Sequence, residues 1–439
     1  MRAGLLPLKR RIFALFWGAG LISDAGTWLQ LITIGSLVAY DTGSASKTVL
    51  IAAATFAPQG IGSPIGGLLA DRYDRRKLLL WTLGLQTLVS LALTGALAAG
   101  QRDASVLAFI VMLQSFAGSL GQPSFQAVIP DLVPREEVQA AVSLGLTAWN
   151  TGRVLGPAAA GLFIAFGLGP SWAVGVNALT FVVLWMAVAR VRRPFPPARI
   201  IAAGDAPLGS LRSEAAIELR GGARVLWRTP GCRFAVLTLV GLHFTLIPFM
   251  GLIPQMVRTV LREGKGTVSV LTSAQGIAAI IAALFATTLL QRWPRSTILK
   301  WSLLSSAASS VLYVTSHTVL QAAIGIFCLG ATVATVFSMT MGMNQRDAPA
   351  AHRGRVLSLA SASGGITYGV GLLSLGWLVD RYSMAGVFVV GAAFQSLGAI
   401  AFGASPQLRA IVDGHPLLEA ADFRRRRPRR PKTSSPASL

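Results

Sequence analysis

Two ionisable side chains, Asp24 and Arg153, occur deep inside long apolar stretches of the sequence. A charged side chain at the centre of a bilayer costs at least ~2.5 kcal/mol on insertion scales, so such residues need partners or a function. At a rise of about 1.5 Å per residue, both would lie roughly 18–22 Å from the same membrane surface. We therefore expect them to form an ion pair. Two roles stay open for such a pair: proton coupling, because a buried carboxylate can take up a proton, and static fixing of the helix packing.

His243 is a third titratable candidate, because an imidazole can change its charge near physiological pH. The alternative, a hydrogen-bonded structural histidine, stays open. The sequence offers no nucleophile–base pair, phosphate-binding loop or metal-ligand cluster, and Cys232 and Cys328 lie far apart. It therefore argues against an enzyme and predicts neither a cofactor nor a metal site. The candidates for proton coupling are Asp24, Arg153 and His243.

Long apolar runs must position these residues. The chain is 53% hydrophobic and only 13% charged, whereas a soluble domain has about 25% charged residues. Runs of about 20 apolar residues can cross a bilayer as helices, and the short alternating segments of a membrane β-barrel are missing. The sequence therefore predicts an all-α membrane protein with twelve transmembrane helices. The predicted spans are 13–39, 48–69, 78–99, 106–129, 138–166, 172–191, 234–257, 268–290, 298–316, 319–343, 355–379 and 385–403.

The topology of these spans accounts for the formal net charge of +22. With the N-terminus inside, most of the 39 Lys and Arg residues fall in inner loops and tails, as the positive-inside rule predicts. We therefore expect a multi-pass protein of the cell (inner) membrane with both termini in the cytoplasm. The basic run 424–430 indicates contact with anionic membrane lipids. A basic patch without base-reading groups does not predict a nucleic-acid partner.

Weak internal symmetry divides the chain into two halves. Residues 71–75 correspond to 291–295, each between the second and third helix of its half, and Gly156 in the fifth helix corresponds to Gly371 in the eleventh. Parallel six-helix repeats of this kind occur in secondary transporters. The expected units are an N-terminal six-helix half (1–191), a cytoplasmic central loop (192–233), a C-terminal six-helix half (234–403) and a basic, disordered cytoplasmic tail (404–439).

The loop at 66–77 carries the most specific motif, a glycine, three residues, then Asp-Arg and a basic run. This motif resembles the signature loop of the major facilitator superfamily. The resemblance implies a twelve-helix transporter with a gating latch, in which the aspartate lies at the inner end of a helix of the other half. A carboxylate at a helix N-terminus is stabilised by about 0.3–1 kcal/mol, which suits a releasable latch. A solvated loop is the alternative, and the similar segment 376–381, on the outer side, is expected to be an interfacial cap. The latch candidates are Gly67, Asp71, Arg72, Arg75 and Arg76.

The fifth helix contains a second motif, which resembles the antiporter motif of this superfamily with small residues in place of two of its glycines. Small residues four apart let helix backbones touch, and proline interrupts the hydrogen-bond ladder; ordinary close packing is the alternative. Segments 22–30 and 122–136 are similar to the exporter branch that includes macrolide and siderophore (enterobactin-type) efflux proteins. The resemblance implies export by alternating access with proton antiport. The residues of the antiporter-type helix are Gly152, Gly156, Pro157 and Gly161.

Substrate contacts are expected on the first, fourth, seventh and tenth helices, which the resemblance implies line the cavity. Mostly neutral side chains suit an amphiphilic organic molecule better than a sugar phosphate or a dicarboxylate. We therefore expect a monomer that exports a small amphiphilic molecule, such as a drug-like compound in multidrug efflux or a secondary metabolite. The alternatives are a siderophore or lipid-like metabolite exporter, and a non-transporting membrane scaffold. The cavity candidates are Trp28, Gln30, Gln114, Gln122, Phe244, Phe337 and Asn344.

Overall fold

A computed structural model describes residues 3–191, 220–245, 247–349 and 353–414. All regular secondary structure within these residues is helical. The helices are η1 (Ala3–Lys9), α1 (Arg11–Thr42), α2 (Ala45–Phe56), α3 (Gln59–Arg72), α4 (Arg75–Ala98), α5 (Ala104–Asp131), η2 (Arg135–Glu137), α6 (Val138–Ala165), α7 (Pro170–Arg190), a helix at 220–228, α9 (Pro230–Thr245), η3 (Ile247–Leu252), α10 (Ile253–Met256), η4 (Val257–Leu261), α11 (Lys265–Arg292), α12 (Arg295–Val314), α13 (Val319–Asp347), α14 (Arg353–Arg381), α15 (Met384–Ala404) and α16 (Pro406–Asp413).

Each predicted span coincides with one helix or with one broken helix, which confirms the all-α membrane fold. The run 48–69 is broken into α2 and α3 next to Pro58, because proline has no backbone N–H to donate to the helical hydrogen bonds. The run 234–257 is broken into α9, η3, α10 and the start of η4. Ten of the described helical segments are long and apolar enough to cross a membrane. The other two long segments, α6 and α12, contain more polar residues, among them Arg153 and Lys300.

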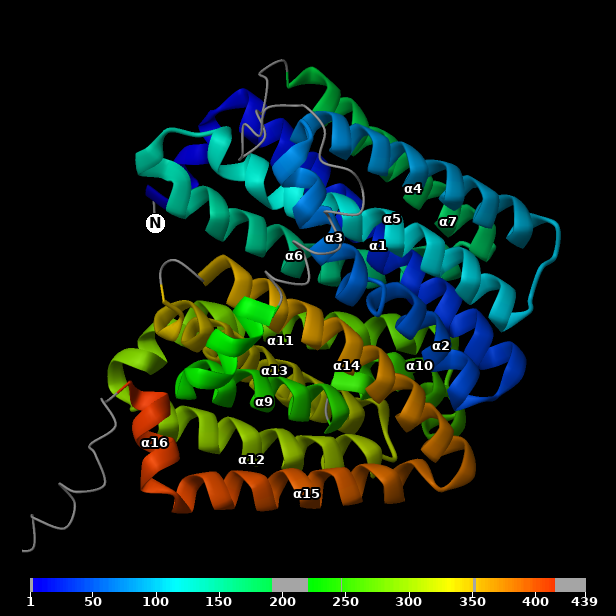
Figure 1. Ribbon diagram of the computed structural model, residues 1–439. Helices are drawn as coiled ribbons and strands as arrows, with labels where there is room; N and C mark the ends of the chain where they lie inside the picture. The colour runs from blue at the N-terminus through cyan, green and yellow to red at the C-terminus, as the bar shows by residue number, and fades with distance from the viewer. Residues whose placement is uncertain (1–2, 192–219, 246, 350–352, 415–439) are drawn as a thin grey trace, which may run out of the picture.

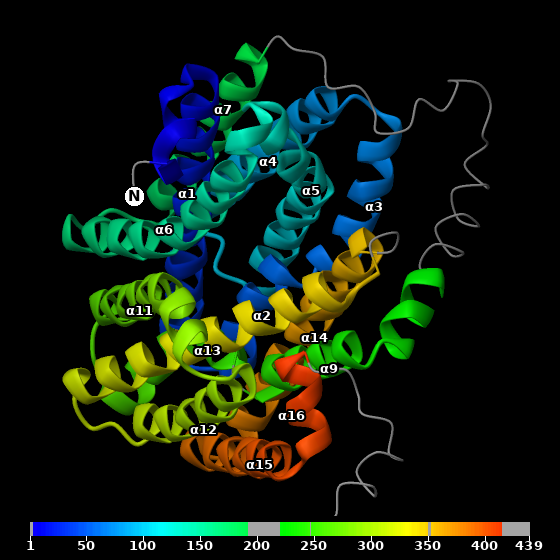
Figure 2. The same ribbon diagram turned by 90° about the vertical axis from the view of Figure 1, so that its left-hand side faces the viewer.

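The helices form two groups that lie against each other along a seam. Figure 1 shows α1 to α7 above and α9 to α16 below, and Figure 2 shows the same division in a view turned by 90°. Across the seam, α6 packs on α11, and α14 packs on α2 and α3. The limits of the expected units stay a prediction, and 192–219 and 415–439 lie outside the described residues.

Glycines allow the close approach of the two groups. A Cβ atom at Gly60 of α3 would lie 2.6 Å from Ile366 of α14, and one at Gly276 of α11 would lie 3.1 Å from the carbonyl oxygen of Arg153 on α6. The largest buried apolar cluster is centred on α9 to α15 and continues through the seam to Leu29 of α1. At these positions, small residues bring the backbones of the two groups close together.

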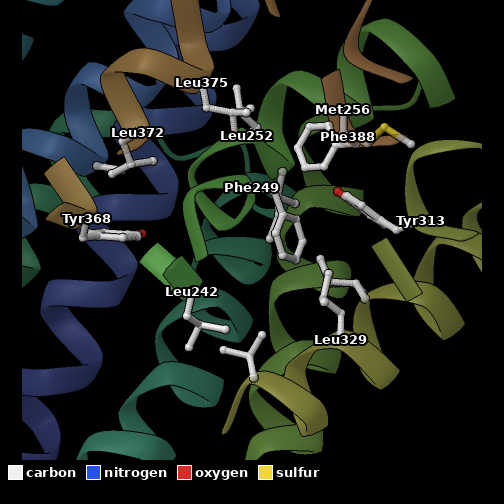
Figure 3. Packing of buried hydrophobic residues seen from close by; sticks show 14 of the residues in the cluster. Leu242, Phe249, Leu252, Met256, Tyr313, Leu329, Tyr368, Leu372, Leu375 and Phe388 are labelled. Atoms are coloured by element: carbon white, nitrogen blue, oxygen red, sulfur yellow. The ribbon is translucent and has the colours of Figure 1, made fainter. Parts of the chain in front are cut away.

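The broken segment η3 supplies a central aromatic side chain to this cluster. Figure 3 shows Phe249 beside both Tyr313 and Phe388. The ring centroids are 5.6 Å apart for Phe249 and Tyr313, and 6.0 Å apart for the edge-to-face pair of Phe249 and Phe388. Such ring pairs contribute about 0.5–1.5 kcal/mol beyond the area that they bury. They fix η3, and with it the neighbouring Met250, beside the seam.

The helix bundle has a proximal and a distal end. The proximal end carries the start of α1 at Arg11 and the loop at 73–74 between α3 and α4. The distal end carries the end of α1 at Thr42, where Gly43 adopts a left-handed conformation with φ of 70°. Glycine adopts this conformation without steric cost, so the chain can turn there directly into α2.

Candidate functional site

The site is built on the contact between α1 and α6. A Cβ atom at Gly152 would lie 2.7 Å from the Cβ of Asp24, and one at Gly156 would lie 2.5 Å from the carbonyl oxygen of Ala25 and from the Cβ of Trp28. The close helix contact predicted from the spacing of these glycines is therefore present. Helix α6 continues through Pro157 to Ala165. Gly161 lies on another face of α6, near Ser269 of α11.

Arg153 extends from α6 into the seam, away from Asp24. Its guanidinium carbon lies 5.4 Å from the ring centroid of Trp28, and its Nη2 donates a hydrogen bond of 3.2 Å to the sulfur of Met250. Its Nε is buried without a partner. The expected ion pair of Asp24 and Arg153 is not formed in the described structure, because Gly152 is the residue that faces Asp24 and the next residue is turned by about 100° around the helix.

A row of aromatic rings crosses the seam beside Arg153. Trp28 lies between Trp149 and Phe56, with centroid distances of 5.9 and 6.0 Å. Phe56 of α2 contacts Tyr368 of α14 edge to face at 5.3 Å, and Tyr368 contacts His243 of α9 at 5.9 Å. His243 forms one end of this row and is buried.

A small cavity of about 30 Å³ lies at the middle of the seam. Its wall includes Trp28, Phe56 and Tyr368 from the aromatic row, together with Met250 and Gln275. Gln275 is fully buried, and neither atom of its amide group has a hydrogen-bond partner in the structure. The indole Nε1 of Trp28 is also buried without a partner. Polar atoms of this kind are normally satisfied in proteins by a protein group, an ordered water or a ligand.

Two of the polar cavity candidates belong to a different site. Gln30 and Gln114 donate amide hydrogen bonds to each other, of 3.1 and 3.4 Å, and Asn177 donates one of 2.7 Å to Gln30. All three side chains are buried. They connect α1, α5 and α7 within one group of helices, which is a packing arrangement and not a cavity wall.

The remaining cavity candidates do not gather at one place with Trp28. Gln122 of α5, Phe244 of α9 and Phe337 of α13 are exposed. Asn344 of α13 is fully buried, and its amide atoms have no hydrogen-bond partner. Sequence reasoning missed Phe56, Tyr368 and Gln275, because a neutral residue in an apolar helix carries no local signal of its place in the fold.

At the proximal end, Arg75 and Arg76 of the segment 66–77 bond within their own group of helices. Arg75 forms an ion pair of 3.3 Å with Asp131 of α5, and Arg76 donates to the carbonyl oxygens of Val188 and Ala189 at the end of α7. Asp71 is exposed. A Cβ atom at Gly67 would meet nothing within 4 Å. A latch role for Gly67, Asp71, Arg72, Arg75 and Arg76 stays a prediction.

At the distal end, the segment 376–381 caps a helix of the other group. The carboxylate of Asp380 accepts hydrogen bonds from the Ser44 hydroxyl and from the amides of Ala45 and Ser46, at 2.8, 2.6 and 2.9 Å. These residues begin α2, whereas Asp380 ends α14. The expected interfacial cap is thus formed across the seam, and we call it the distal bridge, which consists of Asp380 and Ser44, Ala45 and Ser46.

Further polar contacts reinforce the same end. Gln255 of α10 donates a hydrogen bond of 2.7 Å to the carbonyl oxygen of Gly43. Arg258 of η4 donates to the carbonyl oxygen of Ala39 in the last turn of α1. A cation near a helix C-terminus is stabilised by the helix dipole. The two groups of helices are therefore joined at the distal end by contacts to both the end of α1 and the start of α2.

Comparison with known proteins gives one family model, described as transmembrane secretion effector, which matches residues 2–415. An enterobactin exporter, EntS, of Shigella boydii serotype 18 is 33% identical over 142 residues, which are 31% of this chain and 33% of that protein. An uncharacterised MFS-type transporter, YfiS, of Bacillus subtilis strain 168 is 29% identical over 145 residues, which are 33% of this chain and 34% of that protein. The chain thus spans about a third of the length of the curated relatives it matches.

Solved transporter structures share the fold. The inward open conformation of the xylose transporter XylE from E. coli superposes with a TM-score of 0.67 at 14% identity, covering 90% of this chain and 95% of that one. The nucleoside transporter NupG superposes with a TM-score of 0.65 at 12% identity, covering 90% of this chain and 98% of that one. At these identities the similarity is one of fold.

Proposed function

We propose that this chain, which belongs to the transmembrane secretion effector family of major facilitator transporters, exports a small amphiphilic organic molecule by alternating access. Proton antiport would drive the export, as we expect from the antiporter-type helix with Gly152, Gly156, Pro157 and Gly161. The proximal end is then the cytoplasmic end, which agrees with the positive-inside distribution of Lys and Arg. The protein acts as a monomer in the inner membrane.

The way in which the two helix groups meet carries this proposal. Close, glycine-lined contacts such as Gly60 with Ile366 run along the seam and offer little resistance to sliding or rocking. The distal bridge and the bond from Gln255 to Gly43 are polar contacts between the two groups at the distal end. A structure that is joined at one end by releasable hydrogen bonds suits a protein that opens its two ends in turn. A static scaffold has no use for this arrangement.

Three titratable or charged groups in the bundle are the candidates for coupling to protons. Asp24 lies at the contact of α1 with α6, and His243 lies beside Tyr368 in the aromatic row. Arg153 lies over Trp28. Arg153 contacts Met250 across the seam, and a change of charge at such a contact can favour one arrangement of the helix groups over the other.

A siderophore or a lipid-like metabolite is the second candidate substrate. The enterobactin exporters among the relatives favour it, although the match covers only about a third of their length. A drug-like substrate and a siderophore differ in a measurable way, because transport of each can be assayed separately in the same vesicles.

The test is uptake into vesicles of both orientations that contain the purified full-length chain. An exporter with proton antiport accumulates amphiphilic compounds in inverted vesicles when their lumen is acidic, and a protonophore abolishes this accumulation. Vesicles without the protein are the control. Uptake only into right-side-out vesicles would identify an importer, and no uptake of any compound in the panel, siderophores included, would favour a scaffold.

A further inference from the structure

Arg153 is a cation held in the seam without a carboxylate partner among the described residues. Its guanidinium lies over the π face of Trp28 and donates to the sulfur of Met250, and its Nε is buried without a partner. A thioether sulfur is a weak hydrogen-bond acceptor. A cation–π contact compensates only a part of the hydration that a partly buried guanidinium loses. The charge of Arg153 therefore calls for an anion that is not a part of the described protein.

The cavity next to Arg153 offers further hydrogen-bond donors to such an anion. Trp28 and Met250, which contact the guanidinium, also form part of the cavity wall. The indole Nε1 of Trp28 can only donate, and the amide of Gln275 can donate through its Nε2. Both groups are buried without partners. An oxyanion is a chemical group that could accept from donors such as Arg153, Trp28 and Gln275.

The size and the walls of the cavity indicate what the oxyanion is attached to. A volume of about 30 Å³ takes a headgroup and not a whole organic molecule, because a single water needs about half of this volume or less. Phe56 and Tyr368 also line the cavity, and the aromatic row continues outward from it through Trp28 to the partly exposed Trp149. Flat aromatic walls favour a planar ring in the ligand.

We propose that Arg153, Gln275 and Trp28 form a subsite for the carboxylate of an aromatic acid, so that the exported molecule is an anionic aromatic amphiphile. This substrate class rests on the proposed export function, whereas binding at the subsite does not. The ring of the ligand contacts the aromatic row, and its carboxylate neutralises Arg153 in the seam. A cationic compound is disfavoured there by repulsion from the guanidinium.

The test is equilibrium binding of three matched probes, 1-naphthoate, 1-naphthamide and 1-naphthylmethylammonium, to the full-length chain in lipid nanodiscs. The ring is the same in all three, and the charge is negative, zero or positive. We expect 1-naphthoate to bind at least 10-fold more tightly than the other two. In the Arg153→Gln variant this preference disappears, because 1-naphthoate binding weakens about 10-fold or more and 1-naphthamide binding changes less than about 3-fold.

A second variant guards against simple misfolding. Gln275→Met keeps the size of the side chain but removes its amide, so it should weaken 1-naphthoate several-fold with the thermal unfolding temperature unchanged. Arg102→Gln, at an exposed position outside the seam, is the matched control and leaves binding as in the wild type. Equal binding of the three probes, as expected if the cavity holds only water, would overturn the proposal, and so would an equal loss of all three in Arg153→Gln.

Transport of the same probes separates the subsite from the export function. Bound but untransported 1-naphthoate would contradict export and leave the subsite intact. Transport of the amide or the cation in preference to the acid would overturn the subsite and leave export intact.

Discussion

Loss of the Asp380 carboxylate should open the distal end. In the Asp380→Asn variant, an amide replaces the carboxylate that accepts from Ser44, Ala45 and Ser46, so one acceptor oxygen is lost and an N–H group faces the amides of α2. Loss of a capping side chain costs about 0.5–2 kcal/mol, and loss of its charge at a helix N-terminus costs about 0.3–1 kcal/mol. Because Asp380 is exposed, we take about 1–2 kcal/mol in total. This changes the ratio of two conformations by about 5- to 30-fold.

Reaction of a buried cysteine can measure this change. Ala52 of α2 borders the seam cavity and is only 4% exposed, so an Ala52→Cys probe reacts with a membrane-impermeant maleimide only when the distal end opens. Cys232 and Cys328 are first replaced by alanine. From the distal side, Asp380→Asn should then raise the labelling rate by about 5- to 30-fold.

A second capping aspartate provides the control. Asp103 accepts from the amides of Ser105 and Val106 at the start of its own helix, α5, so its cap joins no two groups of helices. Asp103→Asn should change the labelling rate less than about 2-fold. The reasoning is refuted if Asp380→Asn leaves the rate unchanged, or if both variants raise it equally.

Three further predictions concern the inner loop, coupling and packing. Asp71→Asn should impair efflux far more than Gln291→Ala, because only the first copy of the loop keeps its aspartates; equal effects in vesicle efflux assays would contradict a charged latch. Asp24→Asn should lower proton-driven efflux at normal expression, and undiminished coupling to the pH gradient would exclude Asp24 from proton transfer. Gly156→Ala should lower the thermal unfolding temperature, at a cost of about 1–3 kcal/mol, because its Cβ would lie 2.5 Å from α1. The control Gly84→Ala, whose Cβ meets nothing within 4 Å, should be neutral or stabilising. Equal unfolding temperatures of the two variants would show that α1 and α6 are not tightly packed.

The sequence predicts the helices well, because burial in a bilayer demands long apolar runs and those runs are visible in composition alone. The contact of Gly152 and Gly156 with α1 also follows from spacing. The pairing of Asp24 with Arg153 does not, because equal depth in the membrane leaves the rotation of each helix undetermined. Gln30 and Gln114 show a similar limit: a buried amide that bonds to a neighbouring helix and one that faces a cavity have the same local sequence.

The shared cap of α2 has a consequence for amide hydrogen exchange. The amides of Ala45 and Ser46 lie in the first turn of the helix, where a helix offers no acceptor of its own, and their acceptor is a carboxylate that belongs to α14. Their protection against exchange with solvent deuterons therefore depends on the position of the other group of helices and not on the stability of α2 itself. These two amides would act as unlabelled reporters of which end of the bundle is open.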